Sequence, residues 1–305
     1  MTVRLGIDIG LREMKIVEMD GRRLTARTEV LLPEGTMQDG MPTTLLTATL
    51  RSAIEAGGIR GRLARVAIAD TGIAVRDFTL PAIPGKELAD AVIFEGRRLL
   101  PLEASSVYYA WHAQPTRTGY AVYLAAARRD MLDTIMAAVA GAGLQVERID
   151  LKPLALARGA GAADGLVLEW GACEATLVLM VGSRPRFFRS FLLDASPDDL
   201  EAQLEELAFS LNTLVRFMRT AAPDALIDST TPLCLAGRAA YIERGLERAQ
   251  QHFDFAVRPP APPTAFAVAP DFPWQAHLAG LGLYHSISWR GRLDPLKGGE
   301  ARVAA

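Results

Sequence analysis

The chain has 305 residues, of which 50% are hydrophobic and 22% charged, so it is long enough for two domains that each bury a core. Its 33 basic and 35 acidic residues nearly cancel and form no block of like charge, which argues against nucleic acid or an anionic membrane surface as a partner. The 2 cysteines cannot form a disulfide framework, the 4 histidines lack metal-ligand spacing, and no apolar run reaches the roughly 18 residues of a membrane span. We therefore expect a cytoplasmic protein without a metal site, which reaches a membrane only through a partner.

The chain opens with an apolar strand that ends on an acid, a turn at a glycine and a second apolar strand. Asp8 and Gly10 lie two residues apart at the end of the first strand, and Lys15 lies in the second. A carboxylate at this position can hold a metal ion or its waters, and a glycine lets backbone N–H groups approach an anion. These residue types favour a phosphate site, whereas the turn itself, LRE at 11–13, does not.

The same pattern returns near the middle of the chain. Equal spacings separate acid, glycine and later turn glycine in two copies: Asp8, Gly10 and Gly21, then Glu169, Gly171 and Gly182. Each copy continues into a third apolar strand, over 24–32 and 186–193, so each half is predicted to begin with a three-stranded meander. Two unrelated hairpins of an α/β protein are the alternative, because an acid-x-glycine match alone is weak.

Helices and further strands are predicted between and after these meanders. A helix over 42–56 ends at a glycine pair, the residues 65–80 alternate as strands, and 152–160 forms the connection between the two halves. A long amphipathic helix is predicted to start at Ser196-Pro197-Asp198-Asp199, which combines a capping hydroxyl, a proline and two acids. Six prolines predict a loop over 258–274.

Two meanders that each open a domain on an acid-glycine hairpin resemble the actin-like ATPase fold. In that fold the hairpins face each other across a cleft and close on the nucleotide phosphates, and a later glycine turn receives the adenosine. Gly237, in the segment LCLAGRA over 233–239, is the candidate for this turn. The resemblance implies a candidate nucleotide cleft made of Asp8, Gly10, Lys15, Glu169, Gly171 and Gly237.

The middle of the chain indicates a family within this fold. LPAIPGKEL at 80–88, AVIFE at 91–95 and LLPL at 99–102 are similar to the type IV pilus assembly protein family PilM. The small α+β subdomain that this family shares with the cell-division protein FtsA is matched by VAIAD at 66–70, a strand at 120–126, a helix at 130–142, GL at 143–144, ID at 149–150 and PLALA at 153–157. The resemblance covers about residues 3–290.

The resemblance implies an α/β protein with two related actin-like lobes. Residues 1–160 are expected to form the first lobe, with an inserted small α+β subdomain at about 34–145 and a helix at about 275–289 that returns to this lobe. Residues 161–274 are expected to form the second lobe, including a helical subdomain at about 196–260, and 290–305 a flexible tail.

PilM-like proteins bind the cytoplasmic N-terminal tail of the inner-membrane protein PilN and couple the pilus motor ATPases to the membrane platform. The resemblance therefore implies a scaffold peripheral to the inner membrane, with an extended tail bound between the first lobe's sheet and the inserted subdomain. No catalytic residue is assigned, and the sequence leaves open whether the chain is an enzyme.

Two other functions are alternatives on the same fold. A GspL-like component of a type II secretion platform shares the fold and has lost nucleotide binding, but it continues into a membrane span, whereas this sequence ends in a short polar stretch after Trp289. A phosphotransferase needs a catalytic carboxylate and polar substrate contacts. The residues 66–145 carry apolar strands and a helix between prolines instead, which favours the pilus role.

The two hairpin turns depart from the pattern of ATP-binding relatives. Leu11, Arg12 and Glu13 stand where serine, threonine or glycine is usual, and Glu169 is one methylene longer than the usual aspartate. Glu174 sets a negative charge toward the position of a triphosphate, and two unit charges about 4 Å apart repel by roughly 4 kcal/mol at an effective dielectric near 20. We therefore predict weak or absent binding of ATP with magnesium, no turnover and no resident cofactor.

Overall fold

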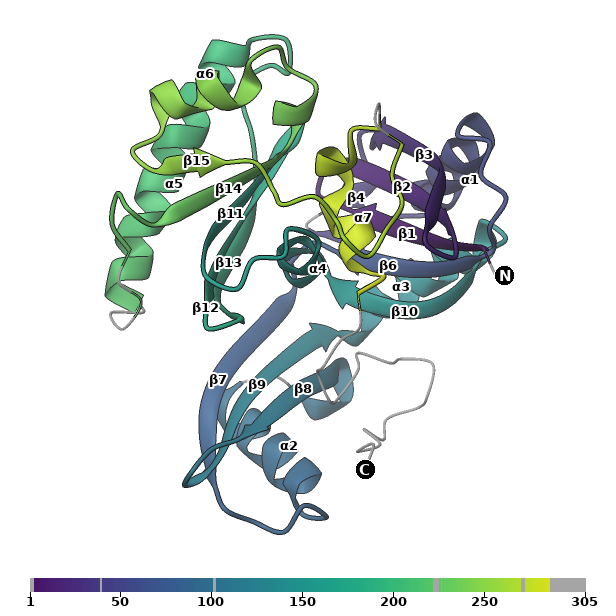
Figure 1. Ribbon diagram of the computed structural model, residues 1–305. Helices are drawn as coiled ribbons and strands as arrows, with labels where there is room; N and C mark the ends of the chain where they lie inside the picture. The colour runs from purple at the N-terminus through teal and green to yellow at the C-terminus, as the bar shows by residue number, and fades with distance from the viewer. Residues whose placement is uncertain are drawn as a thin grey trace.

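The computed structural model describes residues 3–38, 40–100, 103–221, 225, 227–269 and 272–285. Two lobes lie beside each other, and a smaller unit projects away from both (Figure 1). The residues 286–289 of the expected C-terminal helix and the expected tail over 290–305 lie outside the described residues.

The first lobe is built on a five-stranded sheet that begins with the predicted meander, β1 (Val3–Ile9), β2 (Glu13–Asp20) and β3 (Arg23–Leu31). Two later strands, β6 (Leu63–Ile68) and β10 (Gln145–Leu151), lie parallel to β1, which gives the order β10-β6-β1-β2-β3. A short hairpin of β4 (Met37–Gln38) and β5 (Met41–Pro42) precedes helix α1 (Leu45–Ala56). This hairpin is the reason that the helix begins at Leu45 instead of the expected residue 42.

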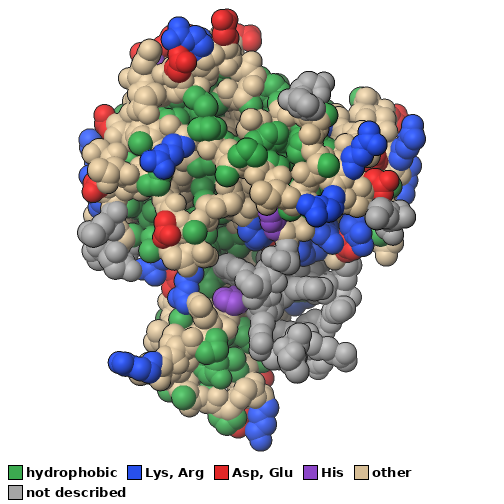
Figure 2. All heavy atoms as spheres, viewed as in Figure 1, with side chains coloured by type: hydrophobic (Ala, Val, Ile, Leu, Met, Phe, Trp, Pro, Cys, Tyr) green, Lys and Arg blue, Asp and Glu red, His purple; other side chains and the backbone are tan. Residues whose placement is uncertain are grey.

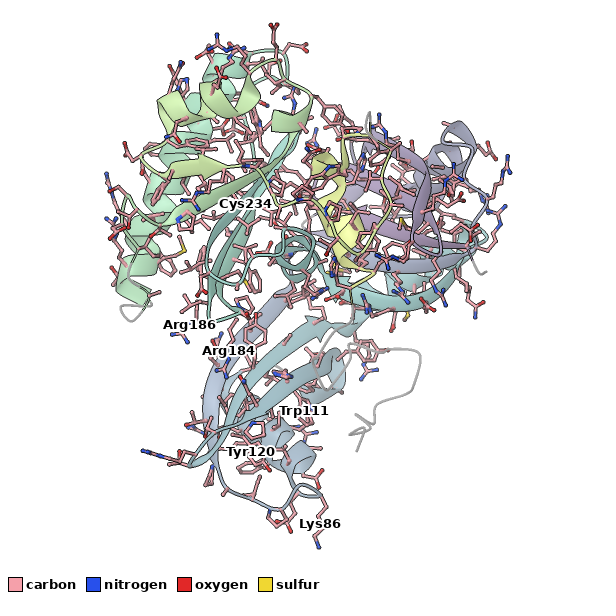
Figure 3. The ribbon with its side chains drawn as sticks, viewed as in Figure 1. Lys86, Trp111, Tyr120, Arg184, Arg186 and Cys234 are labelled. Carbon is pink, nitrogen blue, oxygen red and sulfur yellow. The ribbon has the colours of Figure 1, made fainter. Side chains whose placement is uncertain are left out.

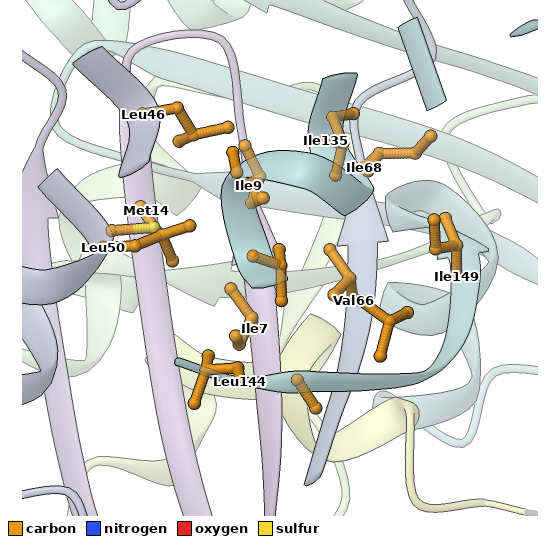
Figure 4. Packing of buried hydrophobic residues seen from close by; sticks show 14 of the residues in the cluster. Ile7, Ile9, Met14, Leu46, Leu50, Val66, Ile68, Ile135, Leu144 and Ile149 are labelled. Carbon is orange, nitrogen blue, oxygen red and sulfur yellow. The ribbon is translucent and has the colours of Figure 1, made fainter. Parts of the chain in front are cut away.

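Strand alternation in β1 decides which residues face the cleft. Ile7 and Ile9 point to the face that α1 and α3 (Arg129–Gly141) cover, whereas Asp8 points to the opposite face. The core under the two helices includes Ile7, Ile9, Met14, Leu46, Leu50, Val66, Ile68, Ile135, Leu144 and Ile149 (Figure 4).

The second lobe repeats this architecture. Its meander is β11 (Gly165–Trp170), β12 (Glu174–Val181) and β13 (Arg184–Leu192), and β14 (Pro232–Gly237) and β15 (Ala256–Arg258) continue the sheet in the order β13-β12-β11-β14-β15. In both lobes the fourth strand pairs in parallel with the first strand of the meander. The repeated spacing in the sequence therefore corresponds to two sheets of the same topology.

Helices α5 (Leu200–Ala221) and α6 (Gly245–His252) accompany the second sheet, with a 3₁₀ turn, η2 (Arg238–Ala240), before α6. The stretch 196–260, expected as a helical subdomain, also supplies β14 and β15, because their apolar residues complete the sheet. Asp199, rather than Ser196, caps the start of α5, since its Oδ1 accepts a hydrogen bond from the N–H of Ala202 at 3.1 Å.

The smaller unit has its own three-stranded sheet, ordered β7 (Ile73–Pro81), β9 (Gly119–Arg128) and β8 (Val107–Pro115). Helix α2 (Leu88–Leu99) packs on this sheet around Val92, Trp111 and Leu124, and the turn η1 (Ala104–Ser106) precedes β8. The unit spans 73–128, which is narrower than the expected 34–145. The difference arises because β6, α1 and α3 bury their apolar residues in the core of the first lobe.

The lobes are joined at a pair of short helices, α4 (Lys152–Gly159) and α7 (Leu278–Gly282), with the 3₁₀ turn η3 (Trp274–His277) before α7. A Cβ atom on Gly159 would lie 2.1 Å from the carbonyl oxygen of Leu278, and one on Gly282 would lie 1.8 Å from that of Ala155. The two helices therefore pack with their backbones in direct contact. Within the described residues of the expected helix at about 275–289, α7 covers Leu278–Gly282 and packs against β1 and β2 of the first lobe.

The proline-rich segment after β15 is irregular, as predicted, but it is anchored to the first lobe. The guanidinium of Arg22 donates hydrogen bonds to the carbonyl oxygens of Thr264 and Ala265, both at 2.8 Å, and the N–H of Ala267 donates to the carbonyl of Arg22 at 2.7 Å. These contacts hold the segment against the start of β3.

Side chains of both charge signs are interspersed with apolar ones over the face shown in Figure 2, in keeping with the near-neutral composition. No helix within the described residues is long and apolar enough to cross a membrane.

Candidate functional site

The tips of the two acid-glycine hairpins meet between the lobes and bind each other reciprocally. The N–H of Arg12, in the first hairpin, donates to Oε2 of Glu174 at 2.6 Å. The N–H of Cys173, in the second hairpin, donates to Oε1 of Glu13 at 2.6 Å. Each turn therefore holds a carboxylate that the opposite hairpin supplies.

The two glycines make this exchange sterically feasible. A Cβ atom on Gly10 would lie 2.0 Å from Oε1 of Glu174, and one on Gly171 would lie 2.5 Å from Oε1 of Glu13. Neither glycine has a positive φ, so the requirement is for space and not for an unusual conformation. Both were predicted to let an anion approach the turn, and in the structure that anion is a carboxylate of the protein.

Lys152, the first residue of α4, lies at the centre of the site with 2% of its side chain exposed. Its Nζ lies 2.9 Å from Oε1 of Glu174, 3.1 Å from Oε2 of Glu169 and 3.2 Å from Oδ2 of Asp8. Lys152 was not predicted to belong to the site. The sequence feature that could have indicated this role is its isolated charge: Lys152 begins an otherwise apolar segment, which forms the helix that connects the two halves.

Lys15, which was assigned to the site, extends from β2 into the same cluster. Its Nζ donates to Oε1 of Glu169 at 3.1 Å and lies 3.9 Å from carboxylate oxygens of Glu13 and Glu29. Glu169 therefore bridges the two lysines, one on each of its oxygens. The structure thus brings the predicted residues Asp8, Lys15 and Glu169 together with Lys152, which was not predicted.

The buried cluster contains four carboxylates and two ammonium groups: Asp8, Glu13, Glu169, Glu174, Lys15 and Lys152. If all six groups were ionised, the cluster would carry a net charge of 2 − 4 = −2. Buried charge that lacks a counterion is unfavourable, so some of these acids must hold protons.

The acids of the cluster differ in the direction of their pKa shifts. Burial, opposed by Lys152, raises the pKa of Asp8 to about 7, and burial also raises the pKa of Glu13. For Glu169, burial is outweighed by Lys15 and Lys152, which hold its pKa down at about 2. Within the described part of the chain, Oδ1 of Asp8 accepts no hydrogen bond, and Oε2 of Glu13 accepts none but lies 3.9 Å from Nζ of Lys15.

Gly237, the third predicted element, lies beside the second hairpin. Its φ is 83°, and a Cβ atom on it would lie 2.2 Å from the carbonyl oxygen of Trp170, so only glycine fits. The next residue, Arg238, donates to Oε1 of Gln203 at 2.7 Å and to the carbonyl of Pro197 at 2.8 Å. Its guanidinium is therefore bound within the second lobe.

A second contact between the lobes covers this side of the cluster. The hydroxyl of Tyr241, which follows η2, accepts a hydrogen bond from Arg27 of β3 at 3.1 Å and lies 3.4 Å from both Glu29 and His277. The guanidinium of Arg27 lies 5.4 Å from the ring centroid of Phe272. Burial lowers the pKa of His277 to about 3, so this ring is neutral at physiological pH.

The protein's own groups fill the cleft between the two hairpins. The hairpin N–H groups of Arg12 and Cys173 already bind carboxylates, and the space in front of Gly10 and Gly171 holds the same carboxylates. The lysines and acids that would face phosphates are bonded to one another. Among the described residues, no group of three or more histidine, cysteine or acidic side chains is arranged to hold a metal ion.

Two lobes with the same sheet order, which meet at paired acid-glycine hairpins, have the actin-like ATPase fold. No protein-family model matches the chain, and a search of curated proteins finds no match either. Among solved structures, the chain is similar to a chain of the PilM-PilN type IV pilus biogenesis complex. The TM-score is 0.70 at 24% identity, and the alignment covers 92% of this chain and 96% of that chain.

Two further solved structures have the same fold. One is the cytoplasmic domain of EpsL, an inner membrane component of the type II secretion system of Vibrio cholerae, with a TM-score of 0.51, 10% identity and coverage of 92% of this chain and 94% of that one. The other is the ethanolamine utilization protein EutJ from Carboxydothermus hydrogenoformans, with a TM-score of 0.52, 15% identity and coverage of 93% and 90%. At these identities the likeness is one of fold, and it confirms the fold class that the sequence predicted.

Proposed function

We propose that the chain is a cytoplasmic scaffold of a type IV pilus platform, which binds the cytoplasmic tail of a PilN-like inner-membrane protein and has a degenerate nucleotide site. The observation that carries the proposal is the cleft itself, in which the protein's own carboxylates bind the hairpin N–H groups. Because these carboxylates fill the cleft, we place the function of the chain on its outer surface, as a binding role. The similarity over nearly the whole length to a PilM-PilN complex supports the partner.

A hollow of about 280 Å³ between the smaller unit and the second lobe is the proposed tail site. Its walls are strands β7 and β13, each of which is the edge strand of its sheet. The lining residues are Asp70, Ile73, Val75, Asp77, Tyr123, Pro185, Arg186, Phe187, Phe188 and Arg189. Figure 3 shows Arg184 and Arg186 of β13 at the end of the second lobe that faces the smaller unit.

The free edge of β13 can pair with an extended peptide. The N–H of Ser190 donates to Oδ1 of Asp70 at 2.9 Å instead of to β12, so this residue's main-chain groups point out of the sheet. Because N–H groups two residues apart in a strand point the same way, the N–H of Phe188 faces the hollow too. Proteins commonly bind an extended peptide as an added strand: the main chains form hydrogen bonds, and every second side chain of the peptide makes apolar contacts.

The resemblance implied a groove between the first lobe's sheet and the inserted subdomain. The hollow begins at Asp70, where the first lobe's β6 leads into β7 of the smaller unit, and its other wall belongs to the second lobe. Its lining contains two acids, Asp70 and Asp77, and two arginines, Arg186 and Arg189, so its formal charge is balanced. We therefore propose a tail with alternating apolar and uncharged polar residues, which would tether the protein to the inner membrane.

A peptide titration tests this function. A labelled peptide of about ten to fifteen residues, taken from the cytoplasmic tail of the neighbouring membrane protein, should bind and raise its fluorescence anisotropy. Val75→Arg fills the hollow and should weaken binding about tenfold or more, which corresponds to roughly 1.4 kcal/mol. The matched control is Phe94→Arg on the exposed face of α2, in the same unit but away from the hollow, and it should bind as the wild type does.

Absence of binding by the wild type at high micromolar peptide would contradict the pilus role. Binding that Val75→Arg leaves unchanged would place the tail elsewhere. A tail from a secretion-platform protein that bound more tightly than the pilus tail would favour the GspL-like alternative, in line with the fold shared with EpsL.

A further inference from the structure

We propose that Glu13 and Glu174 form a latch that keeps the lobes closed without a ligand, each carboxylate occupying the place of a phosphate group at the opposite hairpin. The latch comprises these two carboxylates and the N–H groups of Arg12 and Cys173 that bind them. It concerns the lobes themselves, so it holds whichever partner binds at the surface.

The symmetry of the exchange is the first argument. Glu13 and Glu174 each lie three residues after the hairpin glycine and are the first residues of β2 and β12. Both turns are closed by the same main-chain bond, from the glycine N–H to the carbonyl of this glutamate, at 2.8 Å in each lobe. Each glutamate then reaches across to the N–H that precedes the other glutamate. Two lobes of the same topology thus place the same group in the same position twice.

The chemistry of the acceptor is the second argument. A turn that presents a main-chain N–H beside a glycine is a site for an anionic oxygen, and a carboxylate accepts this bond as a phosphate does. At 2.6 Å, both bonds are shorter than an ordinary N–H···O hydrogen bond, and bonds to an ionised acceptor are shortened in this direction. Because both glutamates have 2% of their surface exposed, water does not compete for the same N–H groups.

The position of Lys152 is the third argument. Its ammonium binds Glu174 from the second lobe and Asp8 from the first at the same time, and its own helix α4 connects the lobes. The latch is therefore held to the connecting helix as well as across the hairpins. A nucleotide would have to displace two carboxylates and break these ion pairs before its phosphates could reach the turns.

Cys173, half-buried at the tip of the second hairpin, reports whether the latch is closed. In the full chain without nucleotide, the rate of alkylation at Cys173 is measured by mass spectrometry, with Cys234 in β14 as the internal reference. Glu13→Ala and Glu174→Ala should each speed alkylation at Cys173 about tenfold or more, the effect expected when one charge-assisted hydrogen bond is lost. Glu147→Ala, which removes a surface carboxylate paired with Arg4 and Arg65, should leave the rate unchanged.

Amide hydrogen exchange is a second measurement. The latch predicts faster exchange in the hairpin opposite the substituted one, which a local packing defect would not produce. Glu174→Ala should speed exchange at the tip of the first hairpin, and Glu13→Ala at the tip of the second. If either alanine variant fails to fold, Glu13→Gln and Glu174→Gln keep an acceptor oxygen and should show smaller effects in the same crossed pattern. Exchange that rises only in the mutated hairpin, or an unchanged Cys173 rate in all four variants, would overturn the latch.

Pyrophosphate tests whether the carboxylates occupy phosphate positions. In Glu13→Ser/Glu174→Ser, millimolar pyrophosphate should slow alkylation of Cys173 again, and it should have no effect on the wild type. An effect of pyrophosphate on the wild type would show that the latch opens for phosphate. No effect on the open double variant would show that the turns are not anion sites. Either result would overturn the proposal, and neither depends on the tail-binding assay.

Discussion

Replacement of Lys152 by methionine removes the central charge of the buried cluster while keeping the length and apolar stem of the side chain. In the structure Nζ of Lys152 contacts carboxylate oxygens of Glu174, Glu169 and Asp8 at 2.9, 3.1 and 3.2 Å. Without it, four acids would face only Lys15, and the formal charge of the cluster would change from −2 to −3. Removing one partner of a buried ion pair typically costs about 3–5 kcal/mol, because the remaining charge stays buried.

A loss of this size is a large share of the roughly 5–15 kcal/mol by which a folded protein is stable. Urea denaturation at pH 7 measures it, with Lys86→Met as the matched control, since Lys86 is exposed on the smaller unit (Figure 3). The double variant Lys152→Met/Glu174→Gln should be more stable than the sum of the two single losses predicts, by about 1–3 kcal/mol, because the two groups interact directly. A loss below about 1 kcal/mol for Lys152→Met, or strict additivity, would refute the network.

Four further predictions follow from the same contacts. The pKa of Asp8 is raised to about 7, so the contribution of Asp8 to stability falls as pH rises from 4 to 7. The pKa of His277 is lowered to about 3, so its contribution rises from pH 3 to 6.5. The two contributions offset each other. Asp8→Asn removes the falling contribution, so the slope of stability against pH over about 4.5–6.5 in urea melts should be more positive than the wild type's, and an equal slope would contradict this. Gly171→Ala should lower stability by about 1–3 kcal/mol in thermal melts, whereas Gly85→Ala, where a Cβ meets nothing within 4 Å, should not. Calorimetry with ATP and magnesium should show no binding to the wild type and weak binding to Glu174→Ser, and a low micromolar dissociation constant for the wild type would show that the cleft opens. Arg22→Ala should speed proteolysis within 259–269 relative to Arg23→Ala, since the Arg22 guanidinium binds the carbonyl oxygens of Thr264 and Ala265. Equal cleavage would mean that the segment is not anchored.

The sequence predicted the two sheets because their signal is local. The spacing of acid, glycine and turn glycine recurs within a single hairpin, and strand alternation then places Asp8 and Glu169 on the faces that meet. The boundaries of the smaller unit were wrong for a related reason. An apolar helix such as α1 or α3 carries no mark of which sheet it will cover, so the unit was drawn too wide.

The content of the cleft could not be predicted from local patterns. Glu174 was interpreted as a charge that would repel a triphosphate, yet in the structure it is bound by the N–H of Arg12 and by Lys152. Both partners come from other elements, and only the closure of the lobes brings them to Glu174. Lys152 was missed because a lysine at the start of a helix is usually solvated, and burial of its ammonium depends on three acids from both lobes.

The backbone contact between α4 and α7 determines how the lobes carry load. The chain passes from the first lobe to the second through α4, and it returns through the residues before α7. At Gly159 and Gly282 these two passages touch without side chains between them. A force that pulls the lobes apart is therefore carried by two crossings of the chain that contact each other, and not by a single linker.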